Sequence, residues 1–126
     1  MKVRELIIGD LVLYFGQSYS IIKVDPESEL CILEDATSFE QASIHDLSPI
    51  PLTPEILEKN EWKKSKINDC AYFYYKDGLF LTYTSKDGKF WFDDFDYSSS
   101  ICVDLPCVHS FQHLLFGLGL NTEMEV

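Results

Sequence analysis

Two histidines stand four residues apart near the end of the chain, within the sequence CVHSFQHLLFGLGL. Residues at this spacing share one face of a helix, so His109 and His113 could supply two imidazole ligands to a metal ion. The H-E-x-x-H pattern of zinc proteases also requires a glutamate directly after the first histidine, where it acts as the general base. Ser110 occupies that position here, and the spacing reveals no third ligand. We therefore predict that the pair holds no metal and that the chain uses no cofactor.

The helix that carries these histidines is predicted to be amphipathic over residues 107–119. At 100° per residue, its apolar side gathers Val108, Phe111, Leu114, Leu115 and Leu118. His109 and His113 fall on the opposite side, beside Gln112 and Gly117. We expect the apolar side to be a packing face, and both histidines to be solvated or lightly hydrogen-bonded.

The second stretch with chemical potential is FWFDDFDY, residues 90–97, which interleaves aromatic rings with three aspartates. Asp94 and Asp96 would share one face of a strand and could bind a divalent cation, with Asp93 on the other face. Alternatively, the rings enter the core and the carboxylates face water. A third interpretation is a protein-docking patch, in which a partner buries Trp91, Phe95 and Tyr97 and the aspartates attract its basic surface. Trp91, Asp93, Asp94 and Asp96 are therefore the candidate binding residues.

No other pattern in the chain points to catalysis. The sequence contains no G-x-x-x-x-G-K-[ST] loop, no G-x-G-x-x-G fingerprint and no G-x-S-x-G nucleophile elbow. The four cysteines, Cys31, Cys70, Cys102 and Cys107, form no C-x-x-C pair. Because of this scatter, we interpret the cysteines as small, buried apolar residues in a reducing compartment, and not as parts of a zinc or redox site. We predict no catalytic residues, and an enzyme is the less favoured interpretation.

Composition limits the kinds of partner. The chain has 126 residues with 21 acidic and 10 basic side chains, which gives a net charge of −11. Nucleic-acid binders gain most of their affinity from contacts of Lys and Arg with phosphates, so we expect no direct nucleic-acid binding. The exception to the acidic balance is the segment EKNEWKKSK (58–66), which contains four lysines. No segment approaches the ~20 apolar residues of a membrane helix. Glu5 and Asp10 interrupt the first apolar run, so we expect no signal peptide and a cytoplasmic protein.

The first 50 residues alternate between short apolar runs and turns. Runs at 11–15, 19–24, 30–33 and 38–44 predict four or five short strands. Such spacing favours a small barrel or a curled sheet. The opening IIGDLVLY resembles the start of SH3-like barrels, in which Gly-Asp makes the turn into the first long strand.

The pattern changes at SPIPLTP (48–54), the best candidate boundary between two halves. Thr53 suits the N-cap of a short helix and Pro54 its first position, and the helix should end near Asn60. An antiparallel meander follows over residues 70–97.

Asp77-Gly78 lies between two aromatic runs of this meander, a strong hairpin signal. That turn places Tyr75 opposite Phe80, Phe73 opposite Thr82 and Tyr72 opposite Tyr83. Both faces of the meander are then heavily apolar, so either both are covered or one is a binding surface. A fourth strand is expected within 100–105, and one aromatic face should pack against helix 107–119.

Three segments together carry a resemblance to known sequences: LIIGDLV, PIPLTPEILEKNEWKK and VHSFQHLLFGLGL. They resemble small uncharacterised proteins of Bacteroidetes bacteria and of their phages and mobile elements, whose last helix follows V-H-x-L-Q-N-L-x-F-A-L-T-G. The matching residues are Ile7, Ile8, Gly9, Val12, Pro49 to Thr53, Leu57, Val108, His109, Gln112, Leu114, Phe116 and Leu118. Asp10, His113 and Gly117 depart from the pattern. The resemblance implies structural motifs and a provenance, and it implies no activity.

These observations predict an α+β chain. An SH3-like small β subdomain should fill residues 1–50, and residues 51–126 should form a helix, a three- or four-stranded meander and a closing helix. The favoured function is a non-enzymatic protein-interaction module of a phage or mobile-element accessory protein, whose partner presents a basic surface. The alternatives are an acidic nucleic-acid mimic that occupies a DNA-binding protein and a cryptic hydrolase or metal enzyme.

Overall fold

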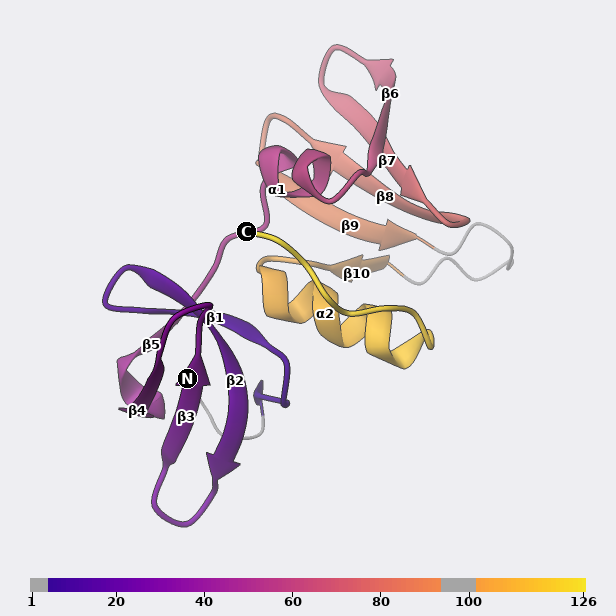
Figure 1. Ribbon diagram of the computed structural model, residues 1–126. Coiled ribbons are helices and arrows are strands. Elements are labelled where there is room, and N and C mark those ends of the chain that lie inside the picture. The colour runs from indigo at the N-terminus through magenta and orange to yellow at the C-terminus, as the bar shows by residue number, and fades with distance from the viewer. Residues whose placement is uncertain (1–4, 94–101) are drawn as a thin grey trace. The chain divides into compact units, whose positions relative to one another are not determined.

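The computed structural model describes residues 5–93 and 102–126, with the backbone alone at residues 93, 102 and 103. The described chain contains two five-stranded antiparallel sheets and two α-helices (Figure 1), which confirms the predicted α+β class. The residues divide into two compact units. Neither of the described helices has the length and apolar character needed to cross a membrane.

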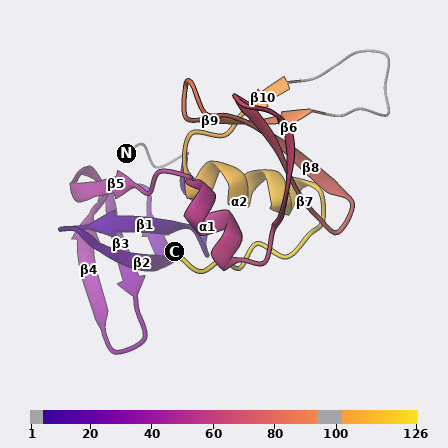
Figure 2. The ribbon, with the colours of Figure 1, turned by 90° about the horizontal axis from the view of Figure 1, so that it is seen from above.

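The first unit comprises residues 1–51 and 107–123, and the strand order in its sheet is β4-β3-β2-β1-β5. Its elements are β1 (Leu11–Tyr14), β2 (Gln17–Asp25), β3 (Leu30–Glu34), β4 (Phe39–Ser43), the 3-10 turn η2 (Ile44–Asp46), β5 (Leu47–Pro49) and α2 (Val108–Gly117). Figure 2 shows this sheet from above. β1 pairs with both β2 and β5, so the last strand of the unit returns to the side of the first.

Alternation of side chains builds the core of the first unit. Successive residues of a strand point to opposite faces, and in β2 the buried residues are Tyr19 and Ile21. Cys31 and Leu33 repeat this pattern in β3. The buried cluster consists of Leu6, Val12, Tyr19, Ile21, Cys31, Leu33, Ala42, Ile44 and Leu47. One face of the sheet therefore lines a continuous apolar core.

A tight turn at Gly9-Asp10 leads the chain into β1. Gly9 has a φ of +98°, a conformation that glycine adopts without steric cost. The Asp10 amide donates to the Ile7 carbonyl at 3.1 Å, and the Asp10 carboxylate accepts from the Ile7 amide at 2.9 Å. The Asp10 carbonyl then accepts from the Ile21 amide at 2.9 Å, which joins the turn to β2. The predicted turn before the first strand is confirmed.

The second unit comprises residues 52–106 and 124–126, and the strand order in its sheet is β10-β9-β8-β7-β6. Its elements are α1 (Pro54–Lys59), β6 (Lys63–Asn68), β7 (Ala71–Lys76), β8 (Leu79–Thr84), β9 (Lys89–Asp93) and β10 (Cys102–Asp104). The cap of α1 is as predicted, since Thr53 Oγ1 accepts a hydrogen bond from the Ile56 amide at 3.3 Å and Pro54 opens the helix.

The hairpin register of the second sheet agrees with the sequence. Tyr75 pairs with Phe80, Phe73 with Thr82 and Tyr72 with Tyr83, as the Asp77-Gly78 turn predicts. Gly78 has a φ of +81° and Asp77 a φ of +52°, the two positive values that a type I′ turn needs. β10 is the expected fourth strand and pairs with β9.

β6 was not predicted from the sequence. Every side chain of KKSKIN is exposed, because β6 is an edge strand with β7 as its neighbour. An edge strand without a buried face carries no alternation of apolar and polar residues, and lysines are common there because they oppose pairing with another chain. This strand therefore lacked a sequence signal.

The structure divides the chain differently from the expected subdomains 1–50 and 51–126. Residues 107–123, which include α2, belong to the first unit. The physical reason is a set of hydrogen bonds between α2 and the Gly9-Asp10 turn. These bonds join groups about one hundred residues apart, which periodicity within a helix does not reveal.

Candidate functional site

The second sheet has one well-buried face. Tyr74, Leu81 and Phe90 project from neighbouring strands and are fully or almost fully buried. The aromatic rings on this face pack closely. The ring centroids of Tyr74 and Phe90 lie 5.8 Å apart, and the Tyr83 ring, on the same face, lies 4.6 Å from that of Phe90. α1 contributes Leu57 to the buried residues of the unit. This face is therefore an aromatic core and not a site.

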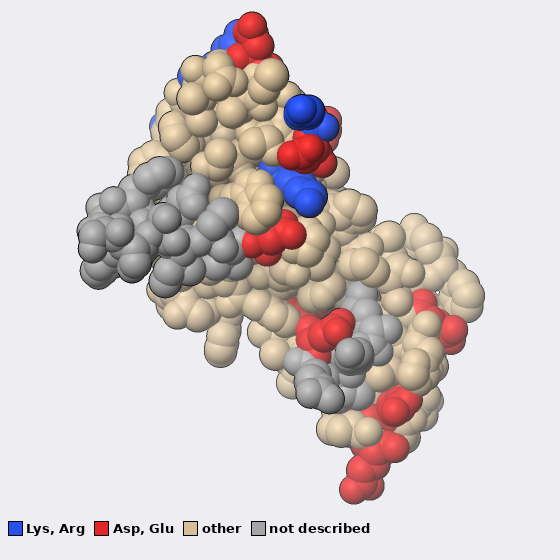
Figure 3. Space-filling view, turned by 180° about the vertical axis from the view of Figure 1, so that it is seen from behind, with Lys and Arg blue, Asp and Glu red and all other residues tan. Residues whose placement is uncertain are grey.

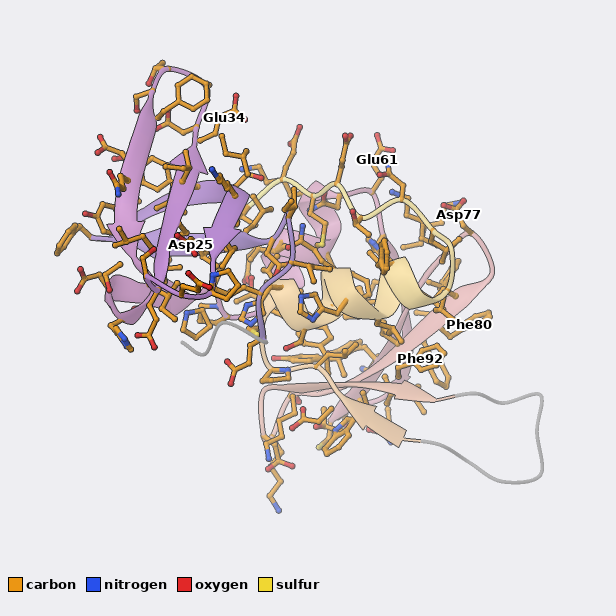
Figure 4. All side chains as sticks on the ribbon, turned by 90° about the horizontal axis from the view of Figure 1, so that it is seen from below. Asp25, Glu34, Glu61, Asp77, Phe80 and Phe92 are labelled. Carbon is orange, nitrogen blue, oxygen red and sulfur yellow. The ribbon has the colours of Figure 1, made fainter. Side chains whose placement is uncertain are left out.

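The opposite side is called here the open face and consists of Phe73, Tyr75, Phe80, Thr82 and Trp91. Strand pairing aligns Phe73, Thr82 and Trp91 in one row across β7, β8 and β9, and it sets Tyr75 beside Phe80 in a second row. Phe80 is 44% exposed, and the other members are partly exposed. Figure 4 labels Phe80 together with Phe92, which pairs with Leu81 and lies on the buried side. Among the described residues, the meander therefore has one well-buried face and one face of partly exposed, mostly aromatic side chains.

Charged residues border the open face at two edges. Lys63 of β6 pairs with Tyr75, and Asp104 of β10 pairs with Trp91. Asp104 is exposed, and Lys89 Nζ lies 6.0 Å from the centroid of the Trp91 ring. The face thus offers aromatic area in its middle, a lysine at the β6 edge, and both a lysine and a carboxylate beside Trp91.

The structure brings together only part of the predicted binding set. Trp91 lies in β9 on the open face, half-buried. Asp93 ends β9 and its backbone pairs with Cys102. Asp94 and Asp96 lie outside the described residues. The role of the three aspartates at a binding site therefore stays a prediction.

The histidine face of α2 is not the solvated face that the sequence predicts. His109 is 7% exposed and Gln112 is 2% exposed. Conversely, Leu118 is exposed and Leu114 is only partly buried, although both fall on the predicted apolar side. Val108, Phe111 and Leu115 are buried as expected.

Polar contacts explain why these side chains are buried. The amide of Gln112 is fully used, since its Oε1 accepts from the Leu11 amide at 2.9 Å and its Nε2 donates to the carbonyls of Gly9 and Thr122 at 3.0 Å each. His113 Nε2 lies 2.8 and 3.0 Å from the two carboxylate oxygens of Asp10, whose side chain is fully buried. A helical wheel gives only the angle of each residue around the helix, and assigning its polar side to solvent fails for polar side chains that have buried partners.

A cluster of nucleophilic and titratable groups surrounds the start of α2. Cys107 is the N-cap residue, and its sulfur lies 3.4 Å from His109 Nδ1 and 2.9 Å from Ser110 Oγ. Burial raises the pKa of the Cys107 thiol, but hydrogen bonds with His109 and Ser110 outweigh burial, so the pKa lies below its ordinary value. The hydrogen bond with Cys107 raises the pKa of His109 against the opposing effect of burial.

This cluster does not assemble the ligands of a metal centre. Among the residues that the structure describes, no group of three His, Cys, Asp or Glu side chains could hold a metal ion. The prediction of buried cysteines is correct for Cys31 and Cys107 and wrong for Cys70, which is exposed at the turn between β6 and β7. The side chain of Cys102 is not described.

Comparison with known proteins adds no relative. A scan against protein-family models, a search of curated proteins and a search of solved structures each returned no match.

Proposed function

We propose that this protein is a non-enzymatic protein-interaction module that binds its partner through the open face of the second sheet. The observation that carries the proposal is the exposure of aromatic rings on one face, while the other face of the same sheet is packed. Aromatic side chains are enriched at interfaces because they bury a large area with few rotatable bonds. Trp91 and Phe80 are the residues expected to contribute most to affinity.

The partner is proposed to present a basic, partly apolar surface. The net charge of the chain is −11, and the first unit contains ten acidic and three basic residues. On the surface shown in Figure 3, the first unit displays acidic side chains and the lysines belong to the second unit. Asp104 lies beside Trp91, and Asp93, Asp94 and Asp96 follow Trp91 in sequence. Carboxylates next to an aromatic patch would accelerate association with a basic partner.

Docking is favoured over nucleic-acid mimicry because the open face is aromatic and carries Lys63 and Lys89 along its edges. A mimic of a duplex would need acidic residues spaced like phosphates, without lysines among them.

We also propose that the first unit is an SH3-like barrel or a strongly curled sheet. The supporting features are five short strands, a first strand between the second and the fifth, and the 3-10 turn η2 directly before β5. The resemblance of three segments to small proteins of Bacteroidetes and their phages supports an accessory role in a phage or mobile element. Gly9 and Gln112, two residues that carry this resemblance, are hydrogen-bonded to each other.

The test compares two exposed phenylalanines. Phe80 lies on the open face, and Phe39 is 67% exposed on β4 of the first unit. The wild-type chain, Phe80→Ala, Trp91→Ala and Phe39→Ala are each used to capture partners from lysate of the native host. We expect a partner that wild type and Phe39→Ala retain and that both open-face variants lose. Its capture should weaken as ionic strength rises above physiological, where the screening length is about 8 Å.

Equal capture by all four chains would place the interface elsewhere and contradict the proposal. Loss with Phe39→Ala alone would move the interface to the first unit. A partner whose capture is insensitive to salt would contradict the basic surface proposed for it.

A further inference from the structure

β6 lies at one end of the second sheet (Figure 1), and no strand of the described residues pairs with its outer edge. All six of its side chains are exposed. An edge strand keeps a row of backbone N–H and C=O groups that point away from its neighbour, and these groups can pair with a further strand. The outer edge of β6 is therefore accessible to an extended chain.

The charge of this edge differs from that of the whole molecule. β6 contains Lys63, Lys64 and Lys66 and no acidic residue, whereas the chain has a net charge of −11. Lys63 and Lys64 form no ion pair with a described residue. Lys66 Nζ lies 2.9 Å from Asp69 Oδ1, but both side chains are more than half exposed, and such a pair contributes little stability. Carboxylates from outside can therefore reach three ammonium groups.

The pairing of β6 with β7 sorts these lysines between the two sides of the sheet. Lys64 and Lys66 fall on the side of the buried face, and Lys63 and Ser65 fall on the side of the open face. The Lys64 ammonium lies 4.2 Å from the centroid of the Tyr72 ring, which holds it on its side. Side chains two residues apart are about 6.5 Å apart along a strand. A strand beside β6 would thus meet two ammonium groups at the spacing of its own alternate side chains.

We propose that the outer edge of β6 binds an extended acidic segment of a partner protein, which joins the second sheet as a further strand. Its backbone pairs with that of β6, and its alternate carboxylates pair with Lys64 and Lys66. The side chains between the carboxylates lie beside Lys63 and Ser65, where they extend the open face, so apolar residues suit these positions. The same lysines exclude a second copy of β6, because pairing would bring like charges together.

This site is separate from the contact proposed for the open face. Trp91 lies in β9, and β8 and β7 stand between β9 and β6 in the sheet. The lysines of β6 select an acidic segment, whereas the open face is proposed to bind a basic surface. The two proposals can therefore fail independently, and Trp91→Ala should bind an acidic strand as the wild-type chain does.

Three lysines also attract other polyanions, such as single-stranded nucleic acid. A peptide is favoured because the exposed edge offers backbone donors and acceptors in the pattern that another strand completes. A nucleic acid has no backbone that continues a sheet. An oligothymidylate of eight nucleotides is therefore the competing probe.

The experiment measures binding of a synthetic seven-residue peptide that alternates glutamate and valine, labelled with fluorescein. Fluorescence anisotropy gives its Kd for the full chain. Two further peptides carry N-methyl groups, one on every glutamate nitrogen and the other on every valine nitrogen. Because the N–H groups of alternate residues point to the same edge of a strand, only one of these two sets would meet β6. We expect that peptide to bind at least about tenfold more weakly, since two or more hydrogen bonds are lost, and the other to bind as the parent does.

Charge variants assign the role of the lysines. Lys64→Glu replaces an attraction by a repulsion, and we expect it to raise the Kd of the parent peptide at least about fivefold. Lys23→Glu is the matched control, because it changes the charge of the chain equally at an exposed position of β2 in the first unit. It should raise the Kd less than about twofold. Binding of the parent peptide should also weaken as ionic strength rises.

Hydrogen exchange followed by NMR locates the peptide on the wild-type chain. Alternate amides of β6 should exchange more slowly when the peptide is bound, whereas amides of β4, an edge strand of the other sheet, should not change. Equal affinity of the two methylated peptides would show attraction by charge alone and overturn the proposal. The absence of saturable binding, tighter binding of the oligothymidylate than of the peptide, or equal Kd values for Lys64→Glu and Lys23→Glu would overturn it as well.

Discussion

The two units are each built on a five-stranded antiparallel sheet, but they bury their side chains by different means. In the first unit, Gln112 and His113 of α2 reach back to the Gly9-Asp10 turn, and the buried side chains of Gln112 and Asp10 each have hydrogen-bond partners. In the second, the buried face is aromatic, and among the described residues Tyr74 Oη and Thr84 Oγ1 are buried without a hydrogen-bond partner.

The difference shows how the two kinds of burial serve the fold. Paired polar groups fix one position of a helix because any shift leaves them unsatisfied at a cost of about 1–3 kcal/mol each. Aromatic rings stabilise by area and tolerate small shifts. The first unit therefore specifies its own packing, while the second has more aromatic surface than one packed face can cover.

The largest effect should separate the two faces of the second sheet. Phe90 is almost fully buried, and Phe90→Ala is expected to lower the free energy of unfolding by about 3–5 kcal/mol. Phe80→Ala, on the open face, should lower it by less than about 1 kcal/mol. Urea denaturation of both variants gives the two values. Similar losses would mean that the open face is packed in solution.

The next test concerns the packing face of α2. Leu115 is 6% exposed, and Leu115→Ala should cost about 2–5 kcal/mol. Leu118 is 45% exposed, and Leu118→Ala is the matched control with little expected effect. Thermal unfolding of both variants shows whether Leu115→Ala lowers the unfolding midpoint more than Leu118→Ala does. A midpoint for Leu115→Ala equal to that of wild type would make the helix peripheral.

Gln112→Met tests the polar contacts of α2, because methionine keeps the approximate shape of glutamine and lacks its three hydrogen bonds. The Leu11 amide and the carbonyls of Gly9 and Thr122 would lose their partner, at a cost of about 2–3 kcal/mol in total, below the simple sum since water reaches some of them. Chemical denaturation measures this loss. A change of a few tenths of a kcal/mol would show that apolar contacts alone hold α2.

Alkaline pH tests the buried hydroxyl of Tyr74, which has no hydrogen-bond partner among the described residues. Burial, and then the carboxylate of Glu58, raise the pKa of Tyr74 to about 12 from 10.0. The unfolded chain ionises this group first, so stability is complete below pH 10 and falls as pH rises toward 12, by up to about 2 kcal/mol. Tyr74→Phe should remove this loss, and Tyr72→Phe should retain it. Denaturation curves at pH 9 and pH 11 distinguish the variants, and equal slopes for Tyr74→Phe and wild type would refute the assignment.

Much of the fold was predictable because its signals are local. The Asp77-Gly78 turn sets the register of its own hairpin, and Thr53-Pro54 caps its own helix. β6 was missed since an exposed edge strand of lysines has no apolar alternation. The grouping of α2 with the first unit depends on contacts between Gln112 and a turn about one hundred residues earlier, which no local pattern reveals.

The same distinction applies to the candidate sites. Trp91 was singled out because aromatic clustering is visible in the sequence, and strand pairing places it beside Thr82; its role in binding stays a proposal. The Cys107 cluster was missed, although Cys107, His109 and Ser110 are close in sequence, because the wheel assigned His109 to solvent. A buried polar residue is recognisable from sequence only when its partner is also known.

The two tryptophans report directly whether the second sheet has one buried and one open face. Trp62 is 8% exposed after α1, and Trp91 is partly exposed on the open face. Acrylamide quenching of Trp62→Phe, which leaves Trp91, and of Trp91→Phe, which leaves Trp62, measures the exposure of each ring in the free protein. We expect redder emission and stronger quenching for Trp91 than for Trp62. Equal protection of both rings would show that the open face is covered and would contradict the proposed interaction surface.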